Sequence, residues 1–370
     1  MRFSKLLIAN RGEIAVRIVR AAAELGIGTV AVHARDDAGS LHTRMADHCV
    51  ALAADGPAAY LDADALVATA LAAGCDAVHP GYGFLSESAE FARKVRAAGL
   101  AFVGPSAGHL ELFGDKSRSR ALAAECAVPM LAGTQGATGV DEARAFLASL
   151  GPGGAMMIKA IAGGGGRGMR LVHEPDEVEP AWLRCRSEAA SAFGNGDVYV
   201  ERYLPAARHI EIQVLGDGRE AIHLGERECT IQRRNQKLVE IAPSPTLAPA
   251  LRARLCEAAL RMARRVGYEG LGTFEFLVPA EARDDGDGDF AFIEVNPRLQ
   301  VEHTVTEQVL GIDLVRTQLR VAAGASLAEL GLAGLDPKPE GHAIQLRINM
   351  ETLAPDGSTR PSGGTLAAFD

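Results

Sequence analysis

The chain has 370 residues, of which 48% are hydrophobic and 23% are charged, and its net charge is −9. Length and composition indicate a globular protein of two or three domains. The acidic balance argues against a nucleic-acid binder, because duplex affinity depends on neutralising phosphates. No run of about 18 apolar residues predicts a membrane span. The six cysteines lie more than 20 residues apart, which excludes CxxC zinc and redox motifs and favours buried thiols in a cytoplasmic protein.

Residues 1–115 predict an α/β domain with a parallel, doubly wound sheet. Buried strands are expected at residues 5–9 and 29–32, with an amphipathic helix between them. A strand–helix–strand order of this kind makes the two strands parallel. The same domain is expected to contain helices at 62–73 and 88–98 and strands at 77–78 and 101–103.

A glycine-rich segment at residues 163–168 lies between two predicted strands, 155–160 and 169–172. The spacing of its glycines fits a dinucleotide-binding fingerprint, but that fingerprint opens a helix, whereas a strand and Pro175 follow here. Glycines in a hairpin can instead bring backbone N–H groups close to phosphates, and Lys159 adds a positive charge at the strand end. We favour phosphate contact over a plain flexible turn.

Long alternating strands begin near residue 198 and predict a third, mainly antiparallel α+β unit. The strands are expected at 198–202, 209–216, 221–226, 272–278 and 290–296, with a helix at 249–266. The acidic segment at 284–289 is expected to be a solvated turn rather than a calcium loop. A strand at 342–349 is expected to begin a further unit. Residues 365–370 resemble a strand in mid-course, as in a fragment of a longer polypeptide.

Two acidic residues in apolar strands predict a metal site. Glu275 and Glu294 lie among phenylalanines, and the turn between their strands makes them neighbours in a hairpin. Glu294 and Asn296 share one face, because side chains alternate along a strand. Buried carboxylates are unfavourable unless they are paired or bound to metal, and carboxylate and amide oxygens suit Mg²⁺ or Mn²⁺. A buried Arg–Glu pair is the alternative interpretation.

The next segment, residues 296–303, places several polar side chains directly after this strand. The planar side chain of Arg298 can bind a carboxylate-like anion with two hydrogen bonds, and Glu302 can accept a proton. Lys237, at the end of a charged run at 232–237, could face the same anion. The alternatives are a polar helix start for the first segment and a solvated charge run for the second.

Six motifs occur along the chain: residues 9–15 (ANRGEIA), 79–87 (HPGYGFLSE), 114–116 (GDK), the glycine segment, 208–211 (RHIE) and 296–303 (NPRLQVEH). Together they resemble the biotin carboxylases of the ATP-grasp superfamily, and the resemblance extends from residue 3 to the end of the chain. It implies a ligase that converts ATP, bicarbonate and biotin into carboxybiotin, ADP and phosphate. It also implies a Rossmann-like N-terminal domain, an ATP-grasp lid and an antiparallel C-terminal unit that is incomplete.

The resemblance implies a role for each matching residue. The implied ATP-binding residues are Lys116, Lys159, Gly165, Gly166, Glu201, Arg202, Tyr203, Leu204, His209 and Asn235. Glu275, Glu294 and Asn296 would bind Mg²⁺ or Mn²⁺. The implied bicarbonate-binding residues are Lys237, Arg298, Gln300 and Val301. Glu302 would be the general base that acts on bicarbonate, and Arg347 would stabilise the biotin enolate.

The resemblance also implies how the chain is divided and what it works with. The implied parts are the N-terminal domain (1–115), a helical linker (116–132), the lid (133–203), the catalytic unit (204–340) and the start of a C-terminal subdomain (341–370). No Ala-Met-Lys-Met biotinylation sequence occurs, so biotin would be a substrate on a separate carrier domain or chain. A carboxyltransferase would use the carboxybiotin, with an acyl-CoA acceptor expected before pyruvate or urea. A homodimer is implied by the family.

Two departures and two alternative functions accompany this interpretation. Asn235 stands where the family usually has His, and residues 349–352 read NMET where the family usually has Asn-Ala-Glu-Asp. One alternative is another bicarbonate-using ATP-grasp ligase, such as carbamoyl-phosphate synthase, which the segment 79–87 and Arg347 disfavour. The other is a degenerate nucleotide-binding module, which the joint presence of the lysine, glutamate and arginine site residues disfavours.

Overall fold

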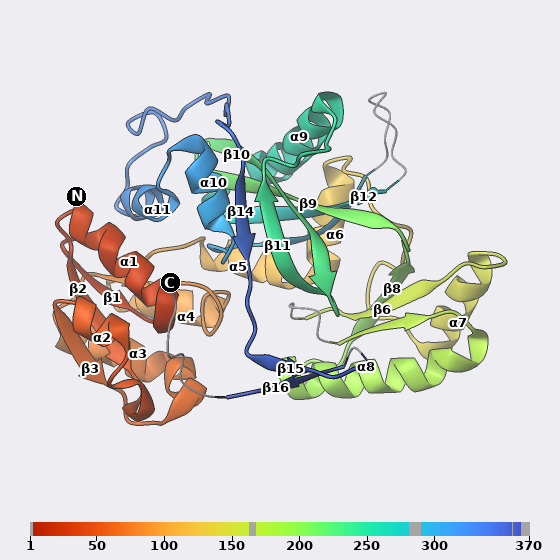
Figure 1. Ribbon diagram of the computed structural model, residues 1–370, viewed down its shortest axis with the longest axis horizontal. Coiled ribbons are helices and arrows are strands. Elements are labelled where there is room, and N and C mark those ends of the chain that lie inside the picture. Colours follow the sequence, from red (N-terminus) through yellow and green to blue (C-terminus); the bar gives the residue numbers. More distant parts are fainter. Residues whose placement is uncertain (1–2, 163–167, 281–289, 357, 364–370) are drawn as a thin grey trace.

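The computed structural model describes residues 3–162, 168–280, 290–356 and 358–363. Figure 1 shows an α/β unit at the left, a large sheet with its helices in the centre, and a small α+β unit at the lower right. The predicted fold class is confirmed, because a parallel N-terminal sheet is followed by antiparallel sheets. Among the described helices, none combines the length and the hydrophobicity that a membrane span requires.

The N-terminal unit is built on a five-stranded parallel sheet with the order β3-β2-β1-β4-β5. Its strands are β1 (Lys5–Ile8), β2 (Gly28–His33), β3 (His48–Ala51), β4 (Ala77–His79) and β5 (Ala101–Phe102). Its helices are α1 (Gly12–Glu24), α2 (Leu41–Met45), α3 (Ala63–Ala72), α4 (Ala89–Ala97) and α5 (Ala107–Gly114). Leu6 and Ile8 pack into one core and Leu7 into another, as expected of a parallel sheet that is covered on both faces.

The small α+β unit contains a three-stranded sheet with the order β7-β6-β8. Its elements, with the helix that precedes them, are α6 (Lys116–Glu125), α7 (Val140–Ser149), β6 (Met156–Ala160), β7 (Met169–Val172), α8 (Val178–Phe193) and β8 (Val198–Arg202). The predicted pairing of the strands around the glycine segment is confirmed, with Lys159 opposite Met169. Helix α8 was missed because Pro175 was taken as a boundary; Pro180 lies in its first turn, where proline is tolerated.

The central sheet has six strands in the order β13-β12-β9-β10-β11-β14. They are β9 (Ala207–Asp217), β10 (Ala221–Arg233), β11 (Gln236–Ala242), β12 (Glu269–Pro279), β13 (Ala291–Asn296) and β14 (Ala343–Leu346). The remaining elements are α9 (Pro249–Arg265), α10 (His303–Leu310), α11 (Leu314–Ala322), β15 (Glu351–Leu353) and β16 (Thr359–Pro361). The predicted turn at 284–289 and the final strand at 365–370 lie outside the described residues.

Strand β11 was not predicted; the charged run at 232–237 was interpreted only as a solvated charge run or as a segment that places Lys237 near the anion. In the structure, Arg233 pairs with Gln236 across a two-residue turn made by Arg234 and Asn235. Both turn residues have left-handed φ angles, 51° and 61°, which is the geometry of a tight hairpin turn that asparagine tolerates well. The run is therefore a hairpin that carries Lys237 on its second strand.

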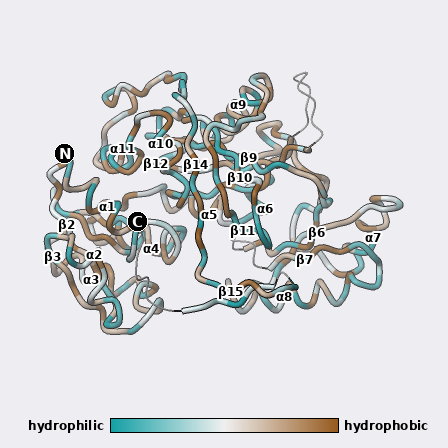
Figure 2. The backbone as a smooth tube through the Cα atoms, viewed as in Figure 1, coloured by the Kyte–Doolittle hydropathy of each residue, from teal (hydrophilic) through white to brown (hydrophobic). Residues whose placement is uncertain are grey.

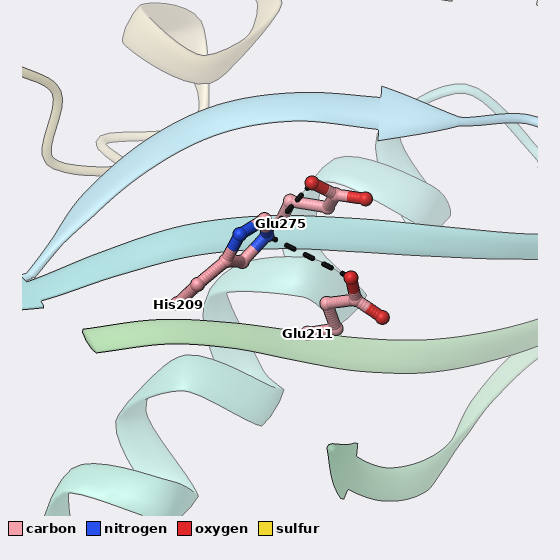
Figure 3. Close-up of side chains that lie close together, drawn as sticks. All are labelled: His209, Glu211 and Glu275. Carbon is pink, nitrogen blue, oxygen red and sulfur yellow. Dashed lines mark ion pairs between the residues drawn. The ribbon is translucent and has the colours of Figure 1, made fainter. Parts of the chain in front are cut away.

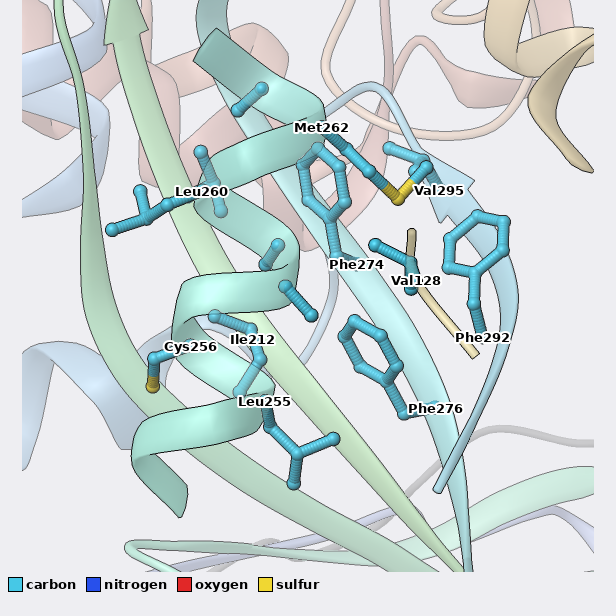
Figure 4. Close-up of a cluster of buried hydrophobic side chains, with 14 of the residues drawn as sticks. Val128, Ile212, Leu255, Cys256, Leu260, Met262, Phe274, Phe276, Phe292 and Val295 are labelled. Atoms are coloured by element: carbon cyan, nitrogen blue, oxygen red, sulfur yellow. The ribbon is translucent and has the colours of Figure 1, made fainter. Parts of the chain in front are cut away.

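The central sheet has one apolar face and one polar face. Along β9, Ile210 and Ile212 point into a core under α9, and β12 adds Phe274 and Phe276 to the same core. Figure 4 shows Ile212, Phe274 and Phe276 between α9 and the sheet. Because side chains alternate along a strand, the residues between them point to the opposite face, which carries the polar groups described below.

The strand expected at 342–349 was predicted to begin a further unit. In the structure, β14 pairs with β11 and forms an edge of the central sheet. Residues on one side of the segment that includes β14 are exposed: Ile344 and Leu346 are each 63% exposed and Ile348 is 81% exposed. Figure 2 shows hydrophobic stretches along this segment as it runs towards β15. The division of the chain into five parts stays a prediction.

Two buried histidines predict a loss of stability in mild acid. Burial lowers the pKa of His79 to about 3 and that of His303 to about 4. In the unfolded chain both titrate near 6.5, so the unfolded state binds more protons below that pH. Each histidine should therefore lower the free energy of unfolding by on the order of 2 kcal/mol between pH 6.5 and 5. Denaturant unfolding measured across this range checks the prediction.

The matched variant is His79→Asn. The Nδ1 atom of His79 accepts a hydrogen bond from the Gly81 N–H at 3.0 Å, and the asparagine oxygen can accept the same bond without titrating. This variant should lose about half of the decrease that the two histidines cause. A variant with the same pH dependence as the parent protein would contradict the assignment to His79.

Candidate active site

One cavity of about 680 Å³ brings together residues from all three units. All of the predicted site residues that the structure describes line it: Lys116, Lys159, Glu201, Arg202, Tyr203, Leu204, His209, Asn235, Lys237, Glu275, Glu294, Asn296, Arg298, Gln300, Val301, Glu302 and Arg347. Gly165 and Gly166 lie outside the described residues. The residues predicted from the sequence therefore lie together in the fold, although they span more than 230 positions of the chain.

One end of the cavity combines apolar walls with two lysines. Lys159 forms an ion pair with the buried Glu201, and Arg120 Nη1 lies 3.3 Å from the same carboxylate. Lys116 Nζ lies 3.5 Å from Glu294. The apolar residues that line the cavity include Leu131, Met157, Met169, Leu277 and Ile293. An apolar slot beside two lysine ammonium groups suits a flat base attached to phosphates.

These apolar residues were missed by the sequence analysis, as were Tyr82, Gly83, Thr230, Gln232 and Asn349, which also line the cavity. A signal for some of them was present. Met157 lies two residues before Lys159 on β6, and residues two apart on a strand share a face. Tyr82, Gly83, Gln232 and Asn349 lie in segments that the sequence analysis had already singled out. The other apolar residues and Thr230 lacked a local signal, because apolar and hydroxyl side chains are common whatever they face.

The centre of the polar face is occupied by the Lys237 ammonium, which lies against three buried carboxylates. It forms a hydrogen-bonded ion pair with Glu211 and lies 3.1 Å from Glu275 Oε1 and 2.9 Å from Glu302 Oε1. The three carboxylates come from β9, β12 and the segment before α10. Glu211 was named in the sequence only as part of a motif, and its role as a partner of Lys237 was not predicted.

Burial and charge act in opposite directions on these carboxylates. Burial raises the pKa of Glu211 above its usual value. For Glu302, burial is opposed by the charges of Lys237, Arg227 and Arg347, which hold its pKa at about 2. Burial is also opposed at Glu275, where Lys237 and His209 hold the pKa well below its usual range. Glu302 is thus an ionised carboxylate at neutral pH, which a proton acceptor must be.

His209 lies between two of these carboxylates, as Figure 3 shows. Its Nε2 atom is 2.8 Å from Glu275 Oε2 and 3.7 Å from Glu211 Oε1. Gln232 donates from its side-chain nitrogen to His209 Nδ1 at 2.7 Å, which fixes the ring. Although burial lowers it, the neighbouring carboxylates raise the pKa of His209 overall.

Three polar side chains at and after the end of β13 line the cavity and are held by hydrogen bonds: Asn296, Arg298 and Gln300. Asn296 donates to Glu275 Oε1 at 2.6 Å and accepts from Arg298 Nη2 at 3.1 Å. Gln300 also donates to Glu275 Oε1, at 3.1 Å. Arg298 is held in addition by Glu87 from the N-terminal unit. Arg298 and Lys237 therefore present two cations on one side of the cavity, which suits a small anion.

Several sets of described residues could hold a metal ion, and two of these sets share Glu275. Glu275 and Glu294 lie directly opposite each other on β12 and β13, and Asn296 is two residues further along β13. Their donor atoms are oxygens, so this set fits a hard divalent cation. The second set is His209, Glu211 and Glu275. The carboxylates of both sets already contact ammonium groups, those of Lys237 and, in the first set, also Lys116. We favour the first set because all of its donor atoms are oxygens.

Arg347 connects two acids at the other end of the cavity. Its Nε donates to Glu240, and its Nη2 donates to Glu302 at 2.8 Å. The Glu240 side chain is fully buried, and its second oxygen, Oε2, has no hydrogen-bond partner among the described residues. Arg347 is thus fixed next to Glu302 by a carboxylate that lies behind it.

Comparison with families of known proteins gives two matches that together span most of the chain. Residues 2–110 match the biotin carboxylase N-terminal domain, and residues 115–330 match the ATP-binding domain of the carbamoyl-phosphate synthase L chain. The whole chain is 46% identical to a biotin carboxylase from Nostoc sp., of which it covers 80%. It is also 48% identical to pyruvate carboxylase from Staphylococcus aureus, and there it spans only 32% of the relative's length.

Solved structures of biotin carboxylases are also similar to this chain. The biotin carboxylase–β,γ-ATP complex from Campylobacter jejuni is 40% identical, with a TM-score of 0.89 over 95% of this chain and 77% of that chain. The biotin carboxylase domain of 2-oxoglutarate carboxylase from Hydrogenobacter thermophilus is 42% identical, with a TM-score of 0.88 over 95% of this chain and 76% of that chain. The latter was solved as a dimer with MgADP, ADP and bicarbonate.

Proposed function

Because this chain belongs to the biotin carboxylase family, we propose that it catalyses the ATP-dependent carboxylation of biotin by bicarbonate. One observation supports this most directly. The same cavity contains Lys237, Arg298, Gln300 and Glu302 together with Lys116 and Lys159, the two lysines expected to bind phosphates. Such a cavity can hold a nucleotide and a small anion in contact with a proton acceptor. The similar solved structures that contain β,γ-ATP, or MgADP and bicarbonate, support the same ligands here.

ATP would occupy the end of the cavity that combines apolar walls with lysines. Lys116 and Lys159 would contact its phosphates, with the backbone at Gly165 and Gly166 close to them. Residues 201–204, His209 and Asn235 would contact the adenosine part. Mg²⁺ or Mn²⁺ held by Glu275, Glu294 and Asn296 would neutralise charge that builds up on the phosphate oxygens.

Bicarbonate would bind between Lys237, Arg298 and Gln300, with the backbone of Val301 beside it. Because bicarbonate is an anion, it would compete with Glu302 for the Lys237 ammonium and weaken the ion pair between these two residues. The pKa of Glu302 would then rise from about 2, because Lys237 is the largest of the effects that lower it. Glu302 would remove the bicarbonate proton as a bicarbonate oxygen attacks the γ-phosphorus and the bond to ADP breaks.

The carboxyphosphate formed would separate into CO₂ and phosphate, and this phosphate would take the ureido proton of biotin. The biotin nitrogen would then attack CO₂, while Arg347 balances the negative charge on the ureido oxygen. Movement of the small α+β unit as a lid would exclude water, which would otherwise hydrolyse carboxyphosphate. Biotin would arrive on a carrier domain or a separate carrier chain.

The acceptor of the carboxyl group stays open among several classes. Relatives include pyruvate carboxylases, a 2-oxoglutarate carboxylase and a single-chain long-chain acyl-CoA carboxylase that is 45% identical with a TM-score of 0.83. The comparisons do not favour the acyl-CoA acceptor that was expected first. A carrier, a carboxyltransferase and a homodimer remain proposed partners, and the six free cysteines are compatible with the proposed cytoplasmic location.

A second candidate is another ATP-grasp ligase that uses bicarbonate, since residues 115–330 match a carbamoyl-phosphate synthase domain. The match of residues 2–110 to a biotin carboxylase domain argues against it. The deciding experiment measures ADP release with Mg²⁺ and ATP, with and without bicarbonate, at zero and high free biotin. Turnover that needs bicarbonate and rises with biotin supports the proposal, whereas bicarbonate-dependent turnover that ignores biotin supports the second candidate.

Removing the charge behind Arg347 tests the biotin end of the cavity. In Glu240→Gln the amide oxygen can still accept from Arg347, but the ion pair is lost. We expect the biotin-stimulated part of the turnover to fall by about tenfold, because charged hydrogen bonds are worth roughly 1.5–3 kcal/mol. The dissociation constant for ATP should not change, since Glu240 does not line the cavity. Equal loss of both properties would show a general folding defect instead.

A further inference from the structure

Arg227, in the middle of β10, has no exposed surface and makes six hydrogen bonds. Its acceptors come from four different parts of the fold: Glu211 and Gln213 on β9, Thr273 on β12, Gln300 before α10, and Thr306 on α10. The distances lie between 2.8 Å and 3.3 Å. Every N–H group of the guanidinium can thus be satisfied, and Arg227 does not line the cavity itself.

The contact with Gln300 fixes the orientation of that side chain. Arg227 has only donors, so the Gln300 atom 3.1 Å from its Nη2 must be the amide oxygen. Glu275, when ionised, only accepts, so the Gln300 atom 3.1 Å from its Oε1 must be the amide nitrogen. The Gln300 amide is therefore held between a cation and an anion, and it cannot flip without losing both bonds.

The contact with Glu211 acts on Lys237 in the same way. One oxygen of Glu211 accepts from Arg227 Nε at 3.3 Å and from Nη2 at 3.2 Å, and the other oxygen binds Lys237. Because Arg227 holds one oxygen of Glu211, the orientation of the carboxylate is fixed, and the other oxygen points towards Lys237. The guanidinium also balances one of the three carboxylates that surround Lys237, so these negative charges do not depend on Lys237 alone.

We propose that Arg227 is the positioning residue of the bicarbonate site, fixing Gln300 directly and Lys237 through Glu211. This inference rests on the proposed function, because it assigns the bound anion as bicarbonate. Arg227 touches no substrate and acts only through its neighbours. Its loss should weaken bicarbonate binding while ATP binding is kept, since none of its six hydrogen bonds goes to a residue proposed to contact ATP.

The test compares Arg227→Lys and Arg227→Met with the parent chain. Lysine keeps the charge that Glu211 needs but has three donors on one atom, so it cannot reach Gln300, Gln213 and Thr306 together. We expect Arg227→Lys to raise the KM for bicarbonate by about tenfold or more, with the dissociation constant for ATP changed less than about twofold. Line broadening of ¹³C-labelled bicarbonate, with Mg²⁺ and a non-hydrolysable ATP analogue, gives a binding readout that needs no turnover.

The matched control is Arg252→Gln. Arg252 Nε binds the buried Glu226 at 2.8 Å, and Glu226 precedes Arg227 on β10 but faces α9. This control should lower the melting temperature and leave the KM for bicarbonate unchanged. If Arg227→Met does not fold, Arg227→Lys decides the question. An unchanged KM and an unchanged linewidth in a folded Arg227→Lys overturn the inference, whereas a parent chain that neither binds nor uses bicarbonate overturns the proposed function as well.

Discussion

Glu302→Gln is expected to lower bicarbonate-dependent ATP turnover by about 10²–10⁴-fold, the usual size of the loss when a general base is removed. The amide has nearly the shape of the carboxylate, and its single oxygen can still accept from one of the two cations, Lys237 or Arg347, which bind different oxygens of Glu302. It cannot take the bicarbonate proton. The dissociation constant for ATP, measured by calorimetry, should remain within about twofold, because Glu302 contacts the cations of the anion site and not the lysines of the nucleotide end.

The control for this variant is Glu226→Gln on β10. Glu226 is also buried, and its partner is Arg252, but it faces α9 rather than the cavity. It should lose stability and keep its turnover. Full activity of Glu302→Gln would refute the base assignment. Equal losses of turnover in both variants would show that burial of a neutral amide, and not the missing base, is responsible.

Lys237→Met is expected to have the largest effect on stability, a loss of about 3–5 kcal/mol at pH 7, because removing one partner leaves buried charge uncompensated. Lys237 lies among the carboxylates of Glu211, Glu275 and Glu302, whose side chains are at most 5% exposed. Methionine fills nearly the same volume without the charge. Bicarbonate-dependent turnover should also be lost, since the anion loses one of its two cations.

The pH dependence distinguishes this mechanism from simple misfolding. In the parent protein the pKa of Glu302 is about 2, below its usual 4.5. Its contribution to stability is therefore present above pH 4.5 and lost as the pH falls towards 2. Without Lys237 the folded-state pKa values of the three acids rise above their unfolded values, so the penalty is full at high pH and shrinks as the pH falls.

The measurement is the difference in free energy of unfolding between Lys237→Met and the parent chain, from pH 8 to pH 5.5. The difference should become smaller as the pH falls, because the acids take up protons. The matched control is Lys94→Met, which removes an ammonium paired with Asp64 and Glu90 at the protein surface. Exposed pairs contribute little, so this control should show a small and nearly constant difference. A constant difference for Lys237→Met would contradict the proposed charge balance.

Much of the site could be predicted because strand periodicity is a local property. The alternation His209, Ile210, Glu211, Ile212 on β9 and Phe274, Glu275, Phe276 on β12 separates a core face from a polar face without reference to any other segment. The hairpin expected from the sequence likewise made Glu275 and Glu294 neighbours, and the structure places them directly opposite each other on β12 and β13. The ordered motifs added the family, which the comparisons confirm.

Two elements that the sequence analysis missed, β11 and α8, were missed because their local sequences are misleading. The charged run at 232–237 has the composition of a solvated loop, and α8 follows a proline that commonly ends an element. Both are ordered because of contacts elsewhere. Strand β11 is held between β10 and β14, and α8 packs on the β6–β7 hairpin through the core that includes Val178 and Cys185.

The sequence by itself determined which residue types lie in each strand, which face they take and which family the chain resembles. Only the tertiary structure decided how the charges pair. Arg227 has the same local pattern whether it faces water or five buried acceptors, and Glu240 could equally have been a surface acid. The antiparallel register brings Lys237 to Glu211 and Glu275, which lie 26 and 38 positions away, and the segment before α10 adds Glu302, 65 positions away. A pairing of that kind is a long-range property, because its energy depends on burial and distance, and neither is encoded in the neighbouring residues.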